Sequence, residues 1–255
     1  MENWKSCKMK YIICDGDQTI YENVKTPVDN SMLATIQNLI DKGYGFGVIS
    51  GTSVNSLAKL VRSGEIEREH HLLGNSGAAY YTCNGNGLEE IYEEKLKLLD
   101  RELIKDALVK LIENYDINPL TNREDQLQDR GSQITLSALG RNAPIKLKEK
   151  YDPNGKKRME YITFLRNFLP EDLYNIKIGG TTSIDITMAK IDKGWGISRF
   201  AECNASKLED IIFFGDKLMP GGNDHSVVKL DGVKCISVKN VRDTLGKLNL
   251  ILHSS

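Results

Sequence analysis

The sequence lacks the features that mark secreted, membrane-spanning and strongly charged proteins. No apolar run reaches about 18 residues, which excludes a transmembrane helix. The 34 Lys and Arg residues balance 35 Asp and Glu, so the net charge of −1 gives no overall bias toward nucleic acid. Cysteines are few, odd in number and without a Cys-x-x-Cys spacing, which indicates free thiols rather than a disulfide framework or a zinc site. The five are Cys7, Cys14, Cys83, Cys203 and Cys235.

The rest of the composition is that of an ordinary globular protein. The 255 residues are 40% hydrophobic and 27% charged, enough to bury a sizeable core as one large domain or as a core with one insertion. Residues 1–8 are too polar for a secretory signal peptide. Together with the reduced thiols, this predicts a cytoplasmic protein that binds neither a membrane nor nucleic acid.

Short apolar runs alternate with helical patterns in the first ninety residues and again from residue 194. This alternation is typical of βα units around a largely parallel sheet. The predicted strands are Lys10–Cys14, Gly45–Ile49, His71–Gly74, Ile211–Phe214 and Val233–Val238, and a hairpin is predicted over Ala78–Cys83 and Leu88–Tyr92. The predicted helices are Val28–Asp41, which starts beside Pro27 and ends at Gly43, Val54–Arg62, Gly194–Cys203 and Val241–Leu250.

The middle of the chain follows a different pattern. Lys97–Tyr115 is a long amphipathic helix, and Gln133–Leu139 alternates apolar and polar residues, which predicts a half-exposed antiparallel strand. A helix over Arg158–Phe168 and strands over Leu173–Ile178 and Ser183–Met188 complete the segment. We therefore predict an α/β core formed by residues 1–90 and 189–255, interrupted by an α+β domain over residues 91–188.

Two carboxylates follow the first predicted strand. Asp15 and Asp17 stand two residues apart where ligands gather at the carboxyl ends of parallel strands. One can serve as nucleophile and metal ligand while the other serves as general acid and base. An acidic surface turn is the alternative for this motif taken alone.

A second acidic loop, residues 215–224, follows the strongly apolar strand at Ile211–Phe214. It places Asp216, Asn223 and Asp224 at the same predicted sheet edge as the first pair. Hard oxygen ligands of this kind suit Mg²⁺, and Asp15, Asp17, Asp216, Asn223 and Asp224 are its predicted ligands. A glycine-rich turn with solvated acids is the alternative, and the pairing with the first loop favours the metal site.

Two further features complete the predicted site. The Ser50-Gly51-Thr52 segment follows the second strand and offers a hydroxyl and free amides to a phosphoryl oxygen. Lys193 precedes a predicted helix and could neutralise a phosphoryl group in transfer. Each taken alone is more often a helix cap or a surface lysine.

In this order the motifs resemble those of the haloacid dehalogenase superfamily of phosphotransferases, and the loop 215–224 resembles that of its phosphomannomutase branch. Asn75-Ser76-Gly77, Arg130-Gly131, Gly140-Arg141 and residues 178–185 fit the same branch, so the resemblance runs nearly end to end. The resemblance implies a Rossmann-like parallel-sheet core with an inserted α+β cap domain. It also implies an Mg²⁺-dependent enzyme that interconverts mannose 6-phosphate and mannose 1-phosphate, with a hexose 1,6-bisphosphate as primer.

The resemblance also assigns roles to individual residues. Asp15 matches the nucleophile, Asp17 the acid and base, and Asp216 the main Mg²⁺ carboxylate. In the cap, Arg130 and Arg141 match arginines that hold the phosphate that is not transferred, and Lys148 lies nearest to a third. Ser183 and Asp185 match residues that contact the sugar or its phosphate. Guanidinium groups suit phosphate and carboxylates suit sugar hydroxyls.

One departure stands out in the first loop. The family pattern is Asp-x-Asp-Gly-Thr, but Gln18 stands in place of the glycine, and glutamine tolerates a positive φ poorly. This predicts a strained or reshaped loop. Two alternative functions share the motifs: a sugar phosphatase of the same superfamily, in which water takes the phosphoryl group, and a non-catalytic phosphosugar-binding protein.

The segment from Arg141 to Arg158 is rich in basic residues, with seven basic and two acidic side chains. An RNA-binding patch is one interpretation, but aromatic residues other than Tyr151 are missing from it. A solvated cap face or a rim that attracts phosphate fits better. We expect a small phosphosugar as the binding partner, and a possible homodimer through the cap.

Overall fold

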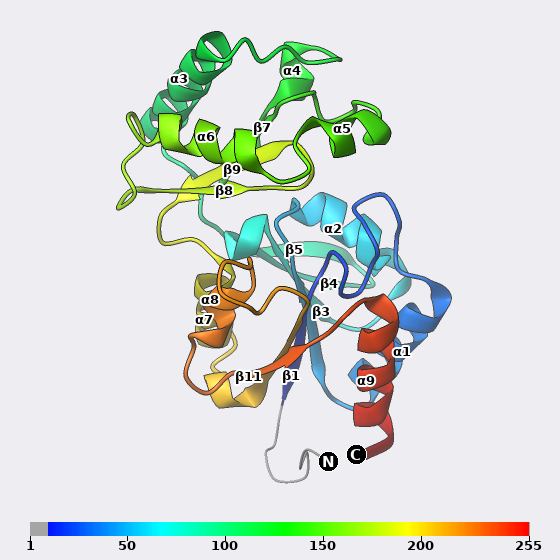
Figure 1. The fold of residues 1–255 in the computed structure, drawn as a ribbon. Helices are drawn as coiled ribbons and strands as arrows, with labels where there is room; N and C mark the ends of the chain where they lie inside the picture. The colour runs from blue at the N-terminus through cyan, green and yellow to red at the C-terminus, as the bar shows by residue number, and fades with distance from the viewer. Residues whose placement is uncertain (1–9, 255) are drawn as a thin grey trace. The chain divides into compact units, whose positions relative to one another are not determined.

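The computed structural model describes residues 10–254, which form two compact units (Figure 1). Unit 1 contains the described residues up to Glu93 and resumes at Asp192, and unit 2 spans Glu94–Ile191. The sequence had placed the two boundaries at residues 90/91 and 188/189. Cys7 and the polar N-terminal segment, on which two predictions were made, lie outside the described residues.

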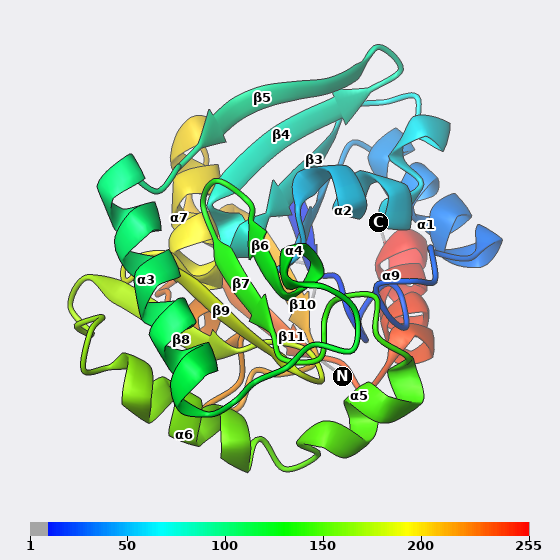
Figure 2. The ribbon, with the colours of Figure 1, turned by 90° about the horizontal axis from the view of Figure 1, so that it is seen from above.

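Unit 1 is built on a seven-stranded sheet with the order β11-β10-β1-β2-β3-β4-β5. The five strands from β11 to β3 are parallel, and β4 and β5 form an antiparallel hairpin at one edge (Figure 2). The strands are β1 (Tyr11–Asp15), β2 (Gly45–Ile49), β3 (His70–Gly74), β4 (Ala79–Asn84), β5 (Gly87–Glu93), β10 (Ile211–Gly215) and β11 (Lys234–Ser237).

Helices cover both faces of this sheet, which explains why its central strands are apolar throughout. Ile12 of β1 packs in a cluster with α1, α2 and α9, whereas the next residue, Ile13, packs in a second cluster with α7 and α8. The helices of unit 1 are α1 (Asn30–Asp41), α2 (Val54–Val61), α7 (Lys193–Cys203), α8 (His225–Val228) and α9 (Val241–Ser254), with short 3₁₀ turns η2 (Ser63–Glu65), η3 (Asn75–Gly77) and η4 (Leu208–Asp210).

The first helix begins two residues later than the sequence predicted. Asp29 is extended and its side chain accepts a hydrogen bond of 2.8 Å from the amide of Met32, so Asp29 caps the helix and α1 starts at Asn30. The prediction had placed the start beside Pro27. The far end matches the prediction, since Gly43 follows the C-cap with a φ of +91°.

Unit 2 is a four-stranded antiparallel sheet with the order β6-β7-β9-β8, covered on one face by α3 and α6 (Figure 1). Its core joins Leu108 and Leu111 of α3 and Leu165 of α6 to Ile134 and Ile186 of the sheet. The elements are α3 (Leu98–Asn114), α4 (Arg123–Gln126), β6 (Leu127–Asp129), β7 (Ile134–Ser137), α5 (Ile145–Tyr151), α6 (Lys156–Leu165), β8 (Tyr174–Ile178) and β9 (Ser183–Met188). The predicted fold class, a parallel α/β core with an inserted α+β domain, is confirmed.

The prediction that the strand at Gln133–Leu139 is half-exposed was wrong. Gln133, Thr135 and Ser137 are all buried, like the apolar residues that alternate with them. The reason is that β7 is an interior strand and its polar side chains have partners: Gln133 donates to Thr135 at 3.0 Å, and Thr135 donates to Asp185 of β9 at 2.7 Å. The second face of this sheet is therefore polar but buried along β7.

The described residues contain neither a membrane-spanning helix nor a disulfide. From residue 10 to residue 254, no helix combines the length and apolar character needed to cross a bilayer. Within the same range, Cys14, Cys83, Cys203 and Cys235 are free thiols.

Candidate active site

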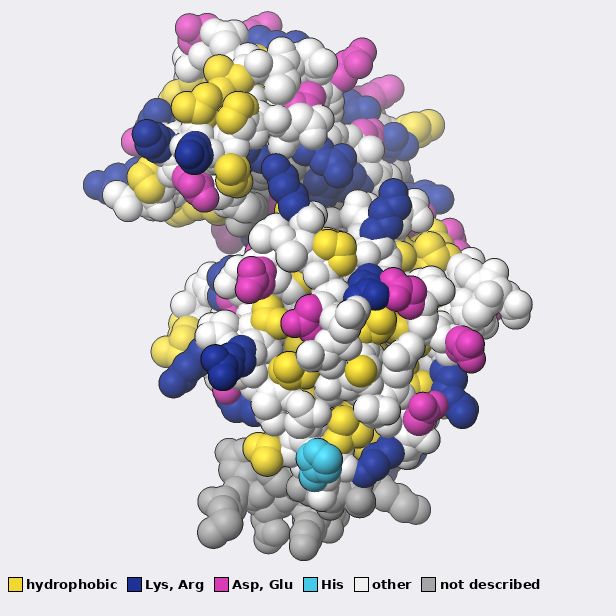
Figure 3. Space-filling view, turned by 90° about the vertical axis from the view of Figure 1, so that its right-hand side faces the viewer, with side chains coloured by type: hydrophobic (Ala, Val, Ile, Leu, Met, Phe, Trp, Pro, Cys, Tyr) yellow, Lys and Arg dark blue, Asp and Glu magenta, His cyan; other side chains and the backbone are white. Residues whose placement is uncertain are grey.

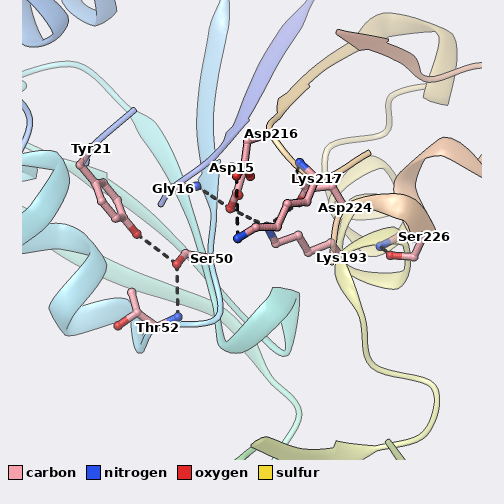
Figure 4. Close-up of polar contacts among 11 residues, drawn as sticks. Asp15, Gly16, Tyr21, Ser50, Thr52, Lys193, Asp216, Lys217, Asp224 and Ser226 are labelled. Atoms are coloured by element: carbon pink, nitrogen blue, oxygen red, sulfur yellow. Dashed lines mark hydrogen bonds and ion pairs between the residues drawn. The ribbon is translucent and has the colours of Figure 1, made fainter. Parts of the chain in front are cut away.

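Asp15 occupies the carboxyl end of β1, the central strand of the parallel part of unit 1. Strands β2 and β10 flank it in parallel, so the ends of three strands meet at this carboxylate. The side chain is buried, and the amide of Gly16 donates to its Oδ1 at 2.6 Å (Figure 4). The fold thus fixes one carboxylate oxygen at the sheet edge where ligands bind in open α/β sheets.

Lys193, which follows the unit 2 insertion in the sequence, contacts the same carboxylate. As the first residue of α7 it follows Asp192, whose side chain caps the helix by accepting from the amide of Trp195. The Lys193 ammonium donates to Asp15 Oδ1 at 2.5 Å and to Asp224 Oδ1 at 2.6 Å, and its side chain is 2% exposed. One buried cation therefore joins the two loops that the sequence predicted to meet.

Asp224 has both carboxylate oxygens engaged within the protein. Oδ1 accepts from Lys193, and Oδ2 accepts from the amide of Lys217 at 3.1 Å. In contrast, no hydrogen bond to Oδ2 of Asp15 is found in residues 10–254. Asp15 thus has a carboxylate oxygen to offer a ligand, whereas Asp224 is placed to hold Lys193.

Burial and the nearby ammonium shift the pKa of Asp15 in opposite directions. Desolvation raises the pKa of the Asp15 carboxyl, and the Lys193 ammonium opposes that rise. Burial lowers the pKa of Lys193, but Asp15 and Asp224 together outweigh this effect and raise it, so the lysine stays protonated. Two carboxylates and one ammonium leave the cluster with one uncompensated negative charge if both acids are ionised.

Carboxylate oxygens gather here in a way that suits a hard cation. Oxygens of Asp15, Asp216 and Asp224 lie within 4.8 Å of one another. Oδ1 of Asp17 and Oδ1 of Asp216 are buried without a hydrogen-bond partner in the described part of the chain. A buried oxygen without a partner is costly unless a ligand satisfies it. The donor set fits Mg²⁺, which prefers carboxylate oxygens.

The remaining predicted ligand, Asn223, lies beside Asp224 in the sequence, but its side chain is exposed. Lys217, in the same loop, places its ammonium 3.8 Å from Asp216. The second acidic loop therefore contributes Asp224 to the buried ion-pair network. It also contributes Asp216, a carboxylate that is less deeply buried.

Asp17 and Gln18 share the turn that follows β1. Asp17 is half-buried, and desolvation raises the pKa of its carboxyl above the usual value for an aspartate. Gln18 adopts a φ of 59°, which lies in the left-handed region that favours glycine. The predicted strain in this turn follows from that conformation. The Gln18 side-chain amide donates to the carbonyl of Glu22, which ties the turn together.

Ser50 lies directly after β2, and its hydroxyl has two partners. The amide of Thr52 donates to Oγ at 3.2 Å, and the hydroxyl of Tyr21 lies 3.1 Å from the same atom. The amide of Ser50 itself donates to the carbonyl of Leu73. The amides of Ser50 and Thr52 are thus engaged within the protein, and the Ser50 hydroxyl is a group that this loop can offer to a phosphoryl oxygen.

The predicted phosphate-binding residues of unit 2 form a second cluster. Arg130 is half-buried, and its pKa is lowered by burial and by the nearby charge of Arg141, while Asp185 raises it. Lys148 of α5 donates to the carbonyl of Arg141 at 3.1 Å. Figure 3 shows Lys and Arg side chains gathered on unit 2, on the face that carries α5. Unit 2 therefore brings three of the predicted cations into one region.

Ser183 and Asp185 lie on β9, on the polar face of the unit 2 sheet. Asp185 is opposite Thr135 of β7 and accepts a hydrogen bond from its hydroxyl, and Ser183 is opposite Ser137. The alternation along β9 thus turns both predicted sugar-binding side chains away from the helices, because Ile184 and Ile186 occupy the helix-covered face.

Sequence reasoning missed two residues that hold these sites in place. Tyr21 contacts Ser50, and the only signal for it is a bulky aromatic close after Gly16. Arg158 is buried and pairs with Asp152 at 2.9 Å, and one of its nitrogens also donates to the carbonyls of Gly179 and Gly180 at 2.8 and 2.7 Å. Its position in a run of basic residues gave no sign of burial.

Comparisons with known proteins agree with this geometry. A sequence model of the family described as eukaryotic phosphomannomutase matches residues 45–254. Phosphomannomutase 1 of Dictyostelium discoideum is 26% identical over 245 residues, which cover 94% of each chain. The phosphomannomutase of Encephalitozoon cuniculi is 27% identical over 244 residues, covering 93% of this chain and 91% of that protein.

Among solved structures, a haloacid dehalogenase-like hydrolase from Bacteroides thetaiotaomicron has a TM-score of 0.66. The match covers 95% of this chain and 99% of the hydrolase at 16% identity, so it supports the fold alone.

Proposed function

The chain belongs to the eukaryotic phosphomannomutase family, and from that membership we propose that it interconverts mannose 6-phosphate and mannose 1-phosphate. It is an enzyme of the haloacid dehalogenase superfamily. The observation that carries the proposed chemistry is the buried Asp15, with one oxygen held by Lys193 and the Gly16 amide and the other open. Such a carboxylate is prepared to attack a phosphorus atom.

In the first half of the reaction, Asp15 takes a phosphoryl group from a hexose 1,6-bisphosphate primer. Oδ2 of Asp15 forms a bond to phosphorus as the bond from phosphorus to the sugar oxygen breaks. Asp17 supplies its proton to that sugar oxygen, and Lys193 offsets negative charge on the phosphoryl oxygens. The products are an aspartyl-phosphate and a hexose monophosphate.

In the second half, the phosphoryl group returns to a sugar. Asp17, now ionised, takes the proton of the accepting hydroxyl as that oxygen attacks the aspartyl-phosphate. Attack by the hydroxyl on carbon 1 or carbon 6 of a mannose monophosphate frees the Asp15 carboxylate and forms a mannose 1,6-bisphosphate. This bisphosphate then gives its other phosphoryl group to Asp15 and leaves as the isomeric monophosphate. If water accepts the group instead, the same residues act as a phosphatase.

Mg²⁺ is the cofactor that the carboxylates favour. The predicted ligands Asp15, Asp17, Asp216, Asn223 and Asp224 would hold it, and the ion would supply positive charge beside the transferring phosphoryl group. The partnerless oxygens of Asp17 and Asp216 support this assignment. Ser50, Gly51 and Thr52 complete the phosphoryl site, with the hydroxyl as principal donor.

Unit 2 supplies the recognition of the second phosphate. Arg130, Arg141 and Lys148 would hold the phosphate that is not transferred, and Ser183 and Asp185 would bind sugar hydroxyls. The clustering of Arg130, Arg141 and Asp185 supports this assignment. We further propose a cytoplasmic enzyme that forms a homodimer through unit 2 and binds neither nucleic acid nor a membrane.

The test follows the fate of phosphorus by ³¹P NMR. The protein is given mannose 1-phosphate, Mg²⁺ and a catalytic amount of glucose 1,6-bisphosphate. With the wild-type protein we expect a growing signal of mannose 6-phosphate without inorganic phosphate. With the Asp15→Asn variant we expect the mannose 1-phosphate signal to stay constant. Growth of inorganic phosphate instead would identify a phosphatase. Binding of mannose 1-phosphate without any turnover would identify a phosphosugar-binding protein and overturn the proposal.

A further inference from the structure

Tyr21 fills the space that a side chain at position 16 would need. A Cβ added to Gly16 would lie 2.2 Å from the Tyr21 hydroxyl oxygen and 2.6 Å from Cζ. The ring is 1% exposed, so it has no room to withdraw without opening the core. Because position 16 is glycine, the Tyr21 ring can pack directly against the turn that joins Asp15 and Asp17.

The backbone of the same turn fixes where the ring enters. The amide of Tyr21 donates to the carbonyl of Gly16 at 3.2 Å, and the amide of Gln18 donates to the carbonyl of Tyr21 at 2.8 Å. Tyr21 therefore belongs to the loop that carries the two aspartates, while its hydroxyl reaches across to β2 and Ser50 (Figure 4).

The hydroxyl of Ser50 has two acceptor positions and one proton to donate. The amide of Thr52 can only donate and fills one acceptor position. The Tyr21 hydroxyl, 3.1 Å away, has Ser50 as its single hydrogen-bond partner in residues 10–254. If Tyr21 donates, Ser50 retains its own proton for a ligand; if Ser50 donates, it has none to offer.

We propose that Tyr21 is a positioning residue that donates its hydroxyl proton to Ser50 and so directs the Ser50 proton toward a phosphoryl oxygen. This inference rests on the proposed phosphoryl transfer. An anionic phosphoryl oxygen accepts from Ser50, and donation from Tyr21 then strengthens that bond because hydrogen bonds in a chain polarise one another. Burial raises the pKa of Tyr21 above its usual value, which keeps the proton on the phenol.

A double-mutant cycle between Tyr21→Phe and Ser50→Ala tests the proposal. Tyr21→Phe keeps the ring that packs on Gly16 and removes only the donor. We expect it to lower kcat/KM for mannose 1-phosphate by roughly tenfold relative to the wild-type protein. We expect Ser50→Ala to lower the same quantity by roughly tenfold to a hundredfold, again relative to the wild-type protein. In the Ser50→Ala background, Tyr21→Phe should change kcat/KM by less than about twofold, because its only route of action is gone.

Tyr80→Phe is the matched control. Tyr80 is a buried tyrosine of the same unit whose hydroxyl bonds His71 at 2.9 Å and Asn204 at 3.1 Å, neither of which is a proposed site residue, so its loss should leave turnover unchanged. A role for Tyr21 that is only structural would show as equal losses in the Ser50 and Ser50→Ala backgrounds. That result, or no effect of Tyr21→Phe in either background, would overturn the proposal.

Binding of orthovanadate with Mg²⁺, measured by calorimetry on the same four proteins, separates this proposal from the proposed function. Vanadate mimics the phosphoryl group and needs no turnover. If the wild-type protein does not isomerise mannose 1-phosphate, the proposed function fails, but the vanadate cycle still reports on Tyr21. Weaker vanadate binding in Tyr21→Phe only when Ser50 is present supports the proposal, and unchanged binding contradicts it.

Discussion

The charged side chains of the two clusters of predicted site residues differ in their burial. In unit 1, Lys193 is buried between Asp15 and Asp224 at 2.5 and 2.6 Å, at the point where parallel strands end. In unit 2, Arg130 is half-buried and Arg141 is exposed, and both lie near the polar face of an antiparallel sheet. Fixed charges suit a reaction that forms and breaks bonds, whereas exposed charges suit the capture of a second phosphate.

Unit 2 does contain a buried ion pair, but that pair serves the backbone. Arg158 bonds Asp152 and also the carbonyls of Gly179 and Gly180, which form the turn between β8 and β9. The turn precedes Ser183 and Asp185. We therefore propose three uses of charge: chemistry at Asp15, recognition at Arg130 and Arg141, and support at Arg158.

The largest effect is expected at the nucleophile. Asp15→Asn keeps the shape of the side chain but replaces the attacking carboxylate with a neutral amide, so kcat should fall about 10⁴-fold or more. The measurement is initial-rate kinetics with mannose 1-phosphate. Asp41→Asn, an exposed aspartate of the same unit paired with Arg68, is the control and should retain full activity. Near-normal turnover by Asp15→Asn would place the chemistry elsewhere.

The buried pair of unit 2 should dominate that unit's stability. Arg158→Ala leaves Asp152 as an uncompensated buried charge and should lower the free energy of unfolding by about 3–5 kcal/mol, read from urea denaturation. Arg199→Ala, which breaks the exposed pair with Glu202, should cost less than about 1 kcal/mol. Similar small losses from both variants would contradict a supporting role for Arg158.

Unit 1 should lose stability in mild acid through His71. Burial among Tyr11, Tyr80 and Phe200 lowers the pKa of His71 to about 4. Below pH 6.5 the unfolded chain binds a proton at this site and the folded chain does not, so stability declines until pH 4 is reached. The loss is about 3 kcal/mol from this group. Urea midpoints at several pH values should decline less steeply in His71→Asn, and equal slopes would exclude His71 as the cause.

Recognition by unit 2 should be separable from the chemistry of unit 1. Arg141→Ala should lower kcat/KM for mannose 1-phosphate about 10- to 100-fold, because a charged hydrogen bond contributes about 1.5–3 kcal/mol. Release of phosphate from an aryl phosphate, which carries no second phosphate, should change less than about twofold. Equal losses for both substrates would mean that Arg141 acts on the chemical step.

The smallest effect is expected at Gln18. Its φ of 59° costs a residue with a Cβ about 1–2 kcal/mol, and glycine relieves that strain while adding flexibility to the unfolded chain. Gln18→Gly should therefore raise the free energy of unfolding by about 0.5 kcal/mol, visible as a small shift of the urea midpoint. A loss of stability would show that the Gln18 side-chain bond to Glu22 outweighs the strain.

Periodicity was a good guide to unit 1 because its strands are buried on both faces and end in polar loops. The ends of β1 and β10 were predicted from the sequence; Asp15 ends β1, and the loop that follows β10 brings Asp224 to the same lysine. The bond between Lys193 and Asp224 links residues 31 positions apart, and no local pattern encodes such a contact.

Unit 2 was harder to predict because its short elements carry little signal. Strand β6 has three residues, and α4 has four, too few for a period of 2 or 3.6 to be visible. The burial of Thr135 depends on Asp185, fifty residues later. Tyr21 was missed for a related reason, since its partner Ser50 is 29 residues away and becomes a neighbour only when β1 and β2 pair.

The most direct test of the account asks where the phosphoryl group is held. The protein is mixed with glucose 1,6-bisphosphate and Mg²⁺, quenched in acid, digested and examined by mass spectrometry. We predict that one phosphoryl group is found on Asp15 in the wild-type protein and is absent from Asp15→Asn. A phosphoryl group on another residue, or turnover without any labelled aspartate, would contradict the assignment of Asp15 as the nucleophile.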